Sequence, residues 1–248
     1  MSKLLVENRA MVFPGDVIAE GNNFEIATPY LKRIGNRVVA TVIGLVTIEK
    51  DDRTTKLGLI PLEGCYYPKV GDLVIGIVID IGVTSWLVDI RAPFPAVLNA
   101  SDYLGKPYNP SEELSKYLNI GDVILAKIAQ FDRGRDPLLT VQEKGLGKVV
   151  EGVLIEIKPS RVPRVVGRRK SMLSMLQEET RCQIVVGNNG RILLRCPDPE
   201  REAIAILAIK KIEREAHTQG LTERIKEFII EQKIKRGLIG SGGGKGET

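Results

Sequence analysis

A short phrase that occurs twice between residues 69 and 144 constrains the fold of this chain more than any other feature. Val70-Gly71-Asp72 and Ile120-Gly121-Asp122 each precede a run of apolar residues. A Gly-Asp pair directly before a strand is typical of a turn that needs residues tolerant of unusual φ. Three further short runs of Val, Ile and Leu, each bounded by turn residues, bring the number of predicted strands to five. Five short strands fit a small closed barrel of the OB type, which presents one face to oligonucleotides.

The residues of this barrel resemble the S1 RNA-binding domain. The resemblance runs through VGDLVIGIVIDIGVTSWLVDI, AVLNASDYL and GDVILAKIAQFDRGRDPLLTV, so it covers the whole barrel. S1 domains carry aromatic side chains on their second and third strands, and Trp86 and Phe94 fall near those places. Trp86 is either a platform on which a base stacks or a filler of the barrel core, and the sequence leaves both open. Phe94 lies between two prolines and is predicted on a loop, in contact with RNA.

Three basic residues complete the RNA surface that we predict for the barrel domain, residues 65–147. They are Lys127, Arg133 and Arg135. The two arginines lie in a predicted turn, where their charge is either merely solvated or in contact with phosphate. The barrel type favours contact with phosphate.

Length and composition bound what else the chain can be. Its 248 residues are enough for two or three small domains, and no apolar run is long enough for a transmembrane helix. The N-terminus lacks the apolar core of a signal peptide. Three cysteines without Cys-x-x-Cys spacing argue against a zinc site or a disulfide framework. We therefore expect no metal and no cofactor, and a reducing cytoplasm as the location.

Basic residues gather in one segment. The net charge is only +5, yet six Lys and Arg residues and no acid lie between Lys158 and Lys170. The rest of the chain is therefore close to neutral. A concentrated patch of this kind attracts a polyanion better than diffuse charge does.

Residues 1–64 are predicted to form a β-rich module. A Pro14-Gly15 turn and a long strand over 37–49, bent at Gly44, indicate strands joined by tight turns. The turn of the hairpin that follows is predicted at residues 51–53. The module has no cluster of acids, bases or nucleophiles, so we expect a structural or partner-binding role.

Residues 148–236 are predicted to form a third domain. Its elements follow in the order β-α-loop-α-β-β-α, which resembles a type I KH domain. In KH domains a Gly-x-x-Gly loop between the first two helices grips the nucleic-acid backbone. The loop at that place is Gly167-Arg168-Arg169-Lys170, with a lysine where the second glycine is expected. The intact match, Gly187-Asn188-Asn189-Gly190, lies between two strands and is predicted to be a hairpin turn.

The basic residues of the third domain are expected to contact phosphates, the alternative being a solvated surface. They are Arg161, Arg164, Arg168, Arg169 and Lys170. Two further predictions concern local structure. One short helix is expected over 111–118, and a flexible Gly-rich tail is expected over 237–248.

The whole chain is similar to the S1/KH-type non-catalytic cap subunit of the archaeal RNA exosome. The features that carry this resemblance are the domain order, the Val12-Phe13-Pro14-Gly15-Asp16 opening and the Gly187–Gly190 hairpin. The resemblance implies a multidomain chain, mainly β with α+β parts, and no membrane contact. It also implies three copies on a hexameric phosphorolytic ring, alone or together with a zinc-ribbon cap subunit. The N-terminal module would dock on the ring, and the chain would bind single-stranded RNA, prefer A-rich tails and guide 3′ ends into the pore.

Two other functions compete with an RNA-binding cap. A nuclease needs clustered carboxylates for metal ions or a pair of histidines, and neither occurs at recognisable spacing. A free S1/KH factor in transcription antitermination or translation is the second alternative. Such factors usually carry two KH domains and a helical N-terminal region, unlike this chain.

Overall fold

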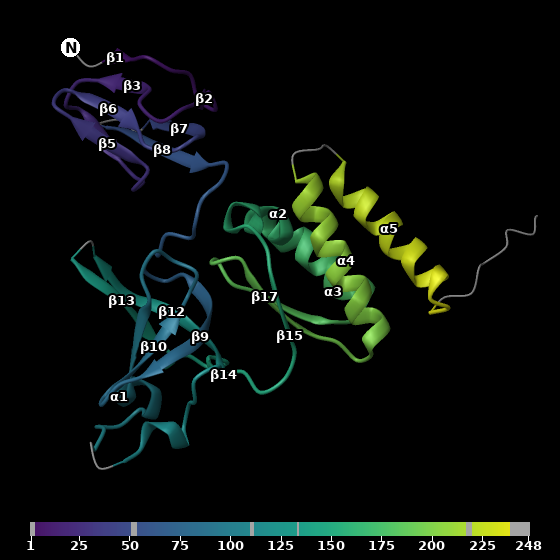
Figure 1. Ribbon diagram of the computed structural model, residues 1–248. Coiled ribbons are helices and arrows are strands. Elements are labelled where there is room, and N and C mark those ends of the chain that lie inside the picture. The colour runs from purple at the N-terminus through teal and green to yellow at the C-terminus, as the bar shows by residue number, and fades with distance from the viewer. Residues whose placement is uncertain (1–2, 51–53, 110–111, 133, 217–219, 239–248) are drawn as a thin grey trace, which may run out of the picture. The chain divides into compact units, whose positions relative to one another are not determined.

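The computed structural model describes residues 3–50, 54–109, 112–132, 134–216 and 220–238 (Figure 1). The chain divides into two compact units, Met1–Gly64 and Cys65–Thr248. Among the described residues, no helix is both long and apolar enough to cross a membrane. The predicted tail falls almost wholly outside the described part.

The N-terminal unit consists of two four-stranded sheets that share one apolar core. The strands of the first sheet are, in spatial order, β1 (Lys3–Leu4), β3 (Val17–Glu20), β6 (Arg37–Ala40) and β5 (Leu31–Ile34). Those of the second are β2 (Met11–Val12), β7 (Gly44–Lys50), β8 (Thr55–Pro61) and β4 (Phe24–Ile26). Ile18, Val38, Val46 and Leu57 are fully buried between the two sheets.

The predicted single strand over 37–49 is wrong. It is two strands, β6 and β7, which belong to different sheets and are separated by residues 41–43. A Cβ at Gly44 would lie 2.6 Å from the carbonyl oxygen of Ile60, so only glycine allows β7 to pair this closely with β8. The apolar residues continue through the break, which is why the sequence reads as one strand. The predicted turn at 51–53 lies outside the described residues, although the strands on either side of it do pair.

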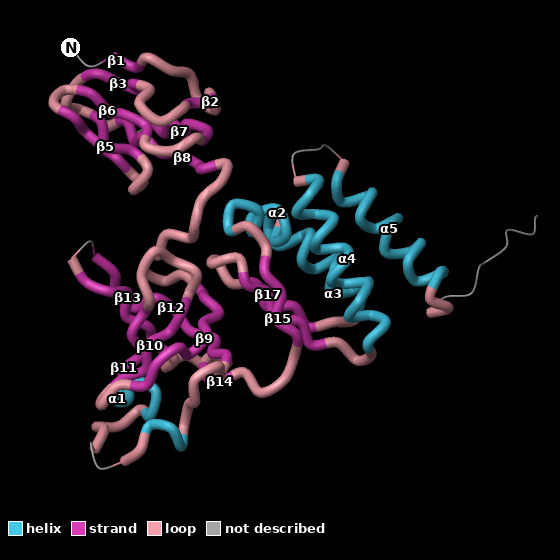
Figure 2. Tube along the Cα trace, viewed as in Figure 1, coloured by secondary structure: helices cyan, strands magenta, loops and turns pink. Residues whose placement is uncertain are grey.

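The second unit begins with the predicted five-stranded barrel. Its strands are β9 (Leu73–Ile81), β10 (Ser85–Asp89), β11 (Ala96–Asn99), β12 (Val123–Asp132) and β13 (Arg135–Thr140). Neighbouring strands pair in the order β13-β11-β10-β9-β12, and β12 also pairs with β13, which closes the barrel (Figure 2). A short strand β14 (Gly147–Lys148) adds to β12.

Trp86 lies in the core of this barrel. Its side chain is fully buried, its indole Nε1 donates a hydrogen bond to the carbonyl of Leu118 at 3.1 Å, and it packs edge-on against Tyr103. A buried indole with a satisfied N–H contributes packing and offers no face to a base. Of the two interpretations left open by the sequence, the structure supports the core, and the assignment of Trp86 to the RNA surface is corrected.

The insertion between β11 and β12 differs from the prediction. A helix α1 (Ala100–Leu104) follows β11 directly, whereas residues 114–116 make only one 3-10 turn where a helix over 111–118 was predicted. Residues 110 and 111 lie outside the described part. Gly105, at φ 65°, ends α1 in the left-handed conformation that glycine adopts without strain.

The remainder of the second unit has the predicted order of a KH domain. The elements are β15 (Val153–Glu156), α2 (Val162–Val166), α3 (Ser171–Thr180), β16 (Gln183–Val186), β17 (Arg191–Arg195), α4 (Pro199–Glu215) and α5 (Leu221–Lys235). The sheet is antiparallel, in the order β15-β17-β16, and the helices lie together on one of its faces (Figure 1). The side chain of Asp198 caps α4 by accepting a hydrogen bond from the backbone N–H of Arg201.

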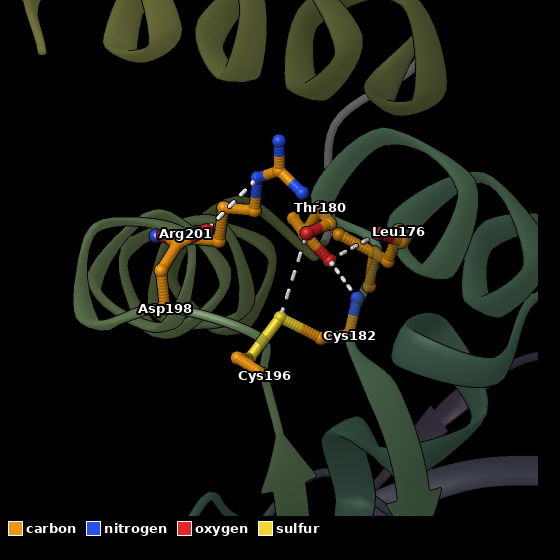
Figure 3. The surroundings of a disulfide bond; sticks show 6 residues. All are labelled: Leu176, Thr180, Cys182, Cys196, Asp198 and Arg201. Carbon is orange, nitrogen blue, oxygen red and sulfur yellow. Dashed lines mark hydrogen bonds and ion pairs between the residues drawn. A yellow bond between two sulfur atoms is a disulfide. The ribbon is translucent and has the colours of Figure 1, made fainter. Parts of the chain in front are cut away.

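A disulfide joins Cys182 to Cys196, which overturns the expectation that no disulfide would form (Figure 3). The last residue pair of the β16–β17 ladder is Gln183 with Arg195, so the two cysteines stand opposite each other just beyond it. Their Cα atoms are 4.3 Å apart. Spacing along the chain does not show which strands pair, so the sequence argument missed the bond. Because this disulfide is present, the argument from the cysteines for a reducing compartment no longer holds.

We predict that this disulfide stabilises the KH domain measurably. Replacing both Cys182 and Cys196 by alanine should lower the free energy of unfolding by about 3 kcal/mol, because the bond closes a loop of roughly 15 residues in the unfolded chain. Urea denaturation of the two proteins measures the difference. Cys65→Ala, which alters the free and exposed cysteine, is the control and should change nothing. Alkylation of the denatured, unreduced protein should label Cys65 alone; labelling of all three cysteines would contradict the bond.

Candidate nucleic-acid interface

The turn Gly187–Gly190 between β16 and β17 lies against the barrel. Asn189 is fully buried there: its Oδ1 accepts from the backbone N–H of Ile75 at 3.3 Å, and its Nδ2 donates to the carbonyls of Ile75 and Ile90 at 2.8 and 3.1 Å. A Cβ at Gly187 would lie 3.1 Å from the backbone nitrogen of Ile75. The turn therefore needs its glycines for close approach between modules, and its backbone is not free to grip RNA.

Arg191, the first residue of β17, completes this junction. It is 3% exposed, and its guanidinium donates to the carbonyl of Asp89 at 2.6 Å, to the Asp89 carboxylate and to Glu156 at 3.0 Å. Burial raises the pKa of Asp89, but hydrogen bonds from the Arg91 backbone and from Arg191 outweigh it and hold that pKa below its usual range. Asp89 therefore remains charged opposite Arg191 at neutral pH.

A hollow of about 740 Å³ opens on the barrel beside three aromatic rings. Tyr67 stands edge-on to Phe131 with ring centroids 5.4 Å apart, and Phe94 lies tilted against Phe131 at 6.1 Å. Phe94 is 41% exposed, so its ring offers a face to a ligand. Aromatic rings gathered in an open hollow on a small barrel suit the stacking of unpaired bases.

Polar side chains rim the aromatic hollow. Arg135, predicted as an RNA contact, is one of them and is exposed. Lys127 does not line the hollow and forms an ion pair with Glu143. Arg133 lies outside the described residues. The lining residues that the sequence argument missed are Tyr67, Val97, Gln130, Phe131, Asp132, Gly134, Asp136 and Leu138.

Phe131 was missed because β12 is irregular. The buried residues Ile124, Ala126 and Ile128 alternate along the strand, but the β12–β13 register shifts twice after Ile128. The Phe131-Asp132 pair, which directly precedes a predicted turn, is the sequence signal that could have identified Phe131.

The loop between α2 and α3 carries the predicted basic residues. Lys170 has φ 64°, so it adopts the left-handed conformation that the expected second glycine would take freely. Arg169 is left-handed as well, at φ 50°. Glycine is still required at position 167, because a Cβ there would lie 2.7 Å from the backbone nitrogen of Met172. The loop thus keeps the backbone shape of a glycine-rich turn while presenting long cations.

These cations have no partner within the described part of the chain. Arg164, Arg168, Arg169 and Lys170 are exposed, Arg161 is half-buried, and none of the five makes an ion pair or side-chain hydrogen bond with another described residue. Many other basic side chains are paired with acids, as Lys211 is with Glu215 and Lys233 with Glu179. Clustered, unpaired cations suit contact with a phosphate backbone.

Comparison with known proteins agrees with this architecture. Residues 9–63 match the model for the exosome RNA binding protein RRP4 N-terminal domain, residues 65–130 match the RRP4 S1 domain, and residues 152–200 match a KH domain. A crystal structure of a candidate exosome complex RNA-binding protein superposes with a TM-score of 0.67 at 50% identity. The match covers 70% of this chain and 99% of that one.

Relatives that this chain matches over nearly their whole length have similar sequence identities. The chain is 56% identical to "Exosome complex component Rrp4" of Ignisphaera aggregans, with 95% of each chain covered. It is 46% identical to the protein of the same name from Saccharolobus solfataricus, with 94% of this chain and 93% of that one covered. Identity of this degree over nearly the whole length, together with the matching modules, shows that the chain belongs to the Rrp4 family of exosome complex components, which are non-catalytic RNA-binding subunits.

Proposed function

We propose that this chain caps an exosome ring and delivers single-stranded RNA to it. The observation that carries the proposal is the aromatic hollow of Phe94, Phe131 and Tyr67 on the barrel, in the same unit as a loop of unpaired cations. The first offers stacking surfaces for bases and the second offers charge for phosphates. Three copies on a hexameric phosphorolytic ring, alone or with a zinc-ribbon cap subunit, would surround the pore and guide 3′ ends into it in the cytoplasm.

A preference for A-rich RNA is supported by the rim of the aromatic hollow. Asp132 and Asp136 carry carboxylates there, and a carboxylate accepts hydrogen bonds without donating any. Adenine presents an exocyclic amino group to such an acceptor, whereas uracil presents carbonyl oxygens at its edge. Adenine also has a large ring system to stack on Phe94 and Phe131.

Docking on the ring is assigned to the N-terminal unit. Met11 pairs with Leu45 and Leu45 with Ile60, so the three side chains form a row on one face of the second sheet. Phe13 and Ile43 extend the patch two residues farther along their segments. Met11, Phe13, Ile43 and Ile60 are each at least 44% exposed. An exposed apolar patch of this kind on a small module marks a protein interface, and exosome components are the partners that the family indicates.

A free S1/KH factor remains the alternative function. It would need no docking surface on residues 1–64, so the apolar patch is the feature that favours the cap. Co-purification with a hexameric ring separates the two functions.

We predict that Phe94→Ala weakens binding of oligoadenylate by about 1–3 kcal/mol, because a stacking surface is lost. The slope of log affinity against log salt should stay the same, since no phosphate contact is removed. Fluorescence anisotropy at several salt concentrations gives both quantities. Val83→Ala, an apolar residue that is 76% exposed on the barrel and does not line the hollow, is the matched control. Equal affinity of Phe94→Ala and wild type would remove the hollow from the RNA path.

Replacing Arg168, Arg169 and Lys170 by alanine should weaken RNA binding to a similar degree for all sequences. Each lost phosphate contact lowers the salt slope by about 0.7 for single strands, so the triple variant should lose roughly 2. The control replaces Arg224, Lys226 and Lys235, which removes the same charge from α5. Parallel salt titrations of the triple variant and wild type, at equal affinity, would leave RNA binding to the barrel alone.

Ile60→Asp should abolish co-elution with a purified hexameric ring, because a charge in the centre of an apolar contact costs at least tenfold in affinity, roughly 1.4 kcal/mol. Size-exclusion chromatography of the mixture measures it. The control is Ile34→Asp, which places the same charge at a residue that is 63% exposed on β5, in the other sheet. If the Ile60 variant elutes with the ring as wild type does, the docking face lies elsewhere.

A further inference from the structure

The turn of the KH domain touches the two segments of the barrel domain that carry Tyr67 and Phe94. These two rings of the aromatic hollow lie outside the barrel strands, on the segment before β9 and on the segment after β10. Only Phe131 stands on a strand, β12. Residues on connecting segments keep a fixed geometry only where other groups hold the backbone. The KH domain supplies such groups for both segments.

Asn188 holds the first segment. Its Nδ2 donates to Asp72 Oδ1 at 2.6 Å, and its backbone N–H donates to the carbonyl of Leu73 at 2.8 Å. The other oxygen of Asp72 accepts a hydrogen bond of 2.6 Å from the hydroxyl of Tyr66. Tyr66 is buried in the barrel, and the next residue is Tyr67. A continuous chain of contacts therefore runs from the KH turn to the residue beside Tyr67.

Arg191 and Ile157, the residue that follows β15, hold the second segment. The guanidinium of Arg191 donates hydrogen bonds to both the carbonyl and the carboxylate of Asp89. Two residues later, Arg91 adopts the left-handed φ of 56° and its Nη1 donates to the carbonyl of Ile157 at 2.9 Å. Phe94 follows three residues after Arg91, so the segment is anchored to the KH domain close to the ring that it presents.

We infer that Asn188 and Arg191 of the KH domain are positioning residues for the aromatic hollow of the barrel, where they fix Tyr67 and Phe94 for base stacking. The inference rests on the proposed function of that hollow. A segment that is already ordered gives up less conformational freedom when a base stacks on it, so the KH domain strengthens binding to bases that it does not touch. Phosphate contacts made by the loop between α2 and α3 do not depend on this ordering.

Asn188→Ala in the full chain tests the inference. Asn188 is exposed and has an ordinary negative φ, so alanine leaves no cavity and no strain. Two probes of equal length are compared by anisotropy: an oligoadenylate, and an oligomer of abasic ribose phosphates. We expect about 3- to 10-fold weaker binding of the oligoadenylate and unchanged binding of the abasic oligomer. Gln142→Ala removes an exposed amide that donates a hydrogen bond within the barrel domain, to the carbonyl of Asp102, and should affect neither probe.

A double-mutant cycle with Tyr67→Ala separates positioning from a general structural role. Once Tyr67 is gone, Asn188→Ala should cause little further loss, because both changes remove the same stacking contact. Asn188→Asp, which also sets a second negative charge against Asp72, should act in the same direction and more strongly. Should Asn188→Ala lower the melting temperature appreciably, Asn188→Ser takes its place in the cycle.

Failure of the inference and failure of the proposed function look different. If wild type binds both probes equally, bases do not stack in the hollow, and both the positioning inference and the proposed function are wrong. If wild type prefers the oligoadenylate but Asn188→Ala keeps the full preference, the positioning role is wrong and the hollow stands. Equal loss on both probes, or fully multiplied losses in the double variant, would likewise overturn the positioning role.

Discussion

The buried polar junction between β17 and the barrel is the constraint on which the RNA-binding unit depends. Asn189 and Arg191 are removed from water, yet they find carbonyls and carboxylates of the barrel within hydrogen-bond distance. A buried guanidinium is costly unless its donors are satisfied, and removing one partner leaves the other uncompensated. The junction therefore favours one arrangement of the two modules over others that would leave these groups unpaired. The barrel and the KH domain therefore belong to one compact unit.

In the proposed function, this arrangement divides RNA binding between the barrel and the KH domain. The hairpin turn of the KH domain packs against the barrel, so we assign the proposed contact with nucleic acid to the α2–α3 loop and its cations. In the proposed function such cations would contact phosphates and read charge and position, whereas the aromatic rings of the barrel would stack on bases. RNA recruited by a cap of this design would be held along its backbone by one module and sampled for base type by the other.

The disulfide closes the opposite end of the same hairpin. Cys182 precedes β16 and Cys196 follows β17, while the turn between the strands reaches the barrel. Thr180 joins the bond to α3: its hydroxyl accepts from the Cys182 backbone at 3.3 Å and donates to Leu176 at 2.7 Å (Figure 3). The hairpin is thus held covalently at one end and by hydrogen bonds at the other. An element held at both ends suits the transmission of position between modules.

The sequence by itself determined the modules. Two Gly-Asp turns and five short apolar runs bounded by turn residues predicted the barrel strands. The alternation of helices and strands predicted the KH order, because local turn chemistry and hydrophobic period act within a few residues. The basic segment could also be identified from the sequence, because counting charges requires no knowledge of the fold. The basic residues named from it, between Arg161 and Lys170, make no ion pair or side-chain hydrogen bond within the part of the chain that the structure describes.

Tertiary structure alone decided how those residues are used. Trp86 and Phe94 are both aromatic residues of one barrel, but strand pairing turns the first into the core and leaves the second open. Tyr67, Phe94 and Phe131 lie far apart in sequence and meet only because the barrel closes. The pairing of Cys182 with Cys196 and the insertion of Asn189 against Ile75 depend in the same way on contacts across many residues. Composition and periodicity report on the neighbourhood along the chain, and they carry no information about which distant segments share a surface.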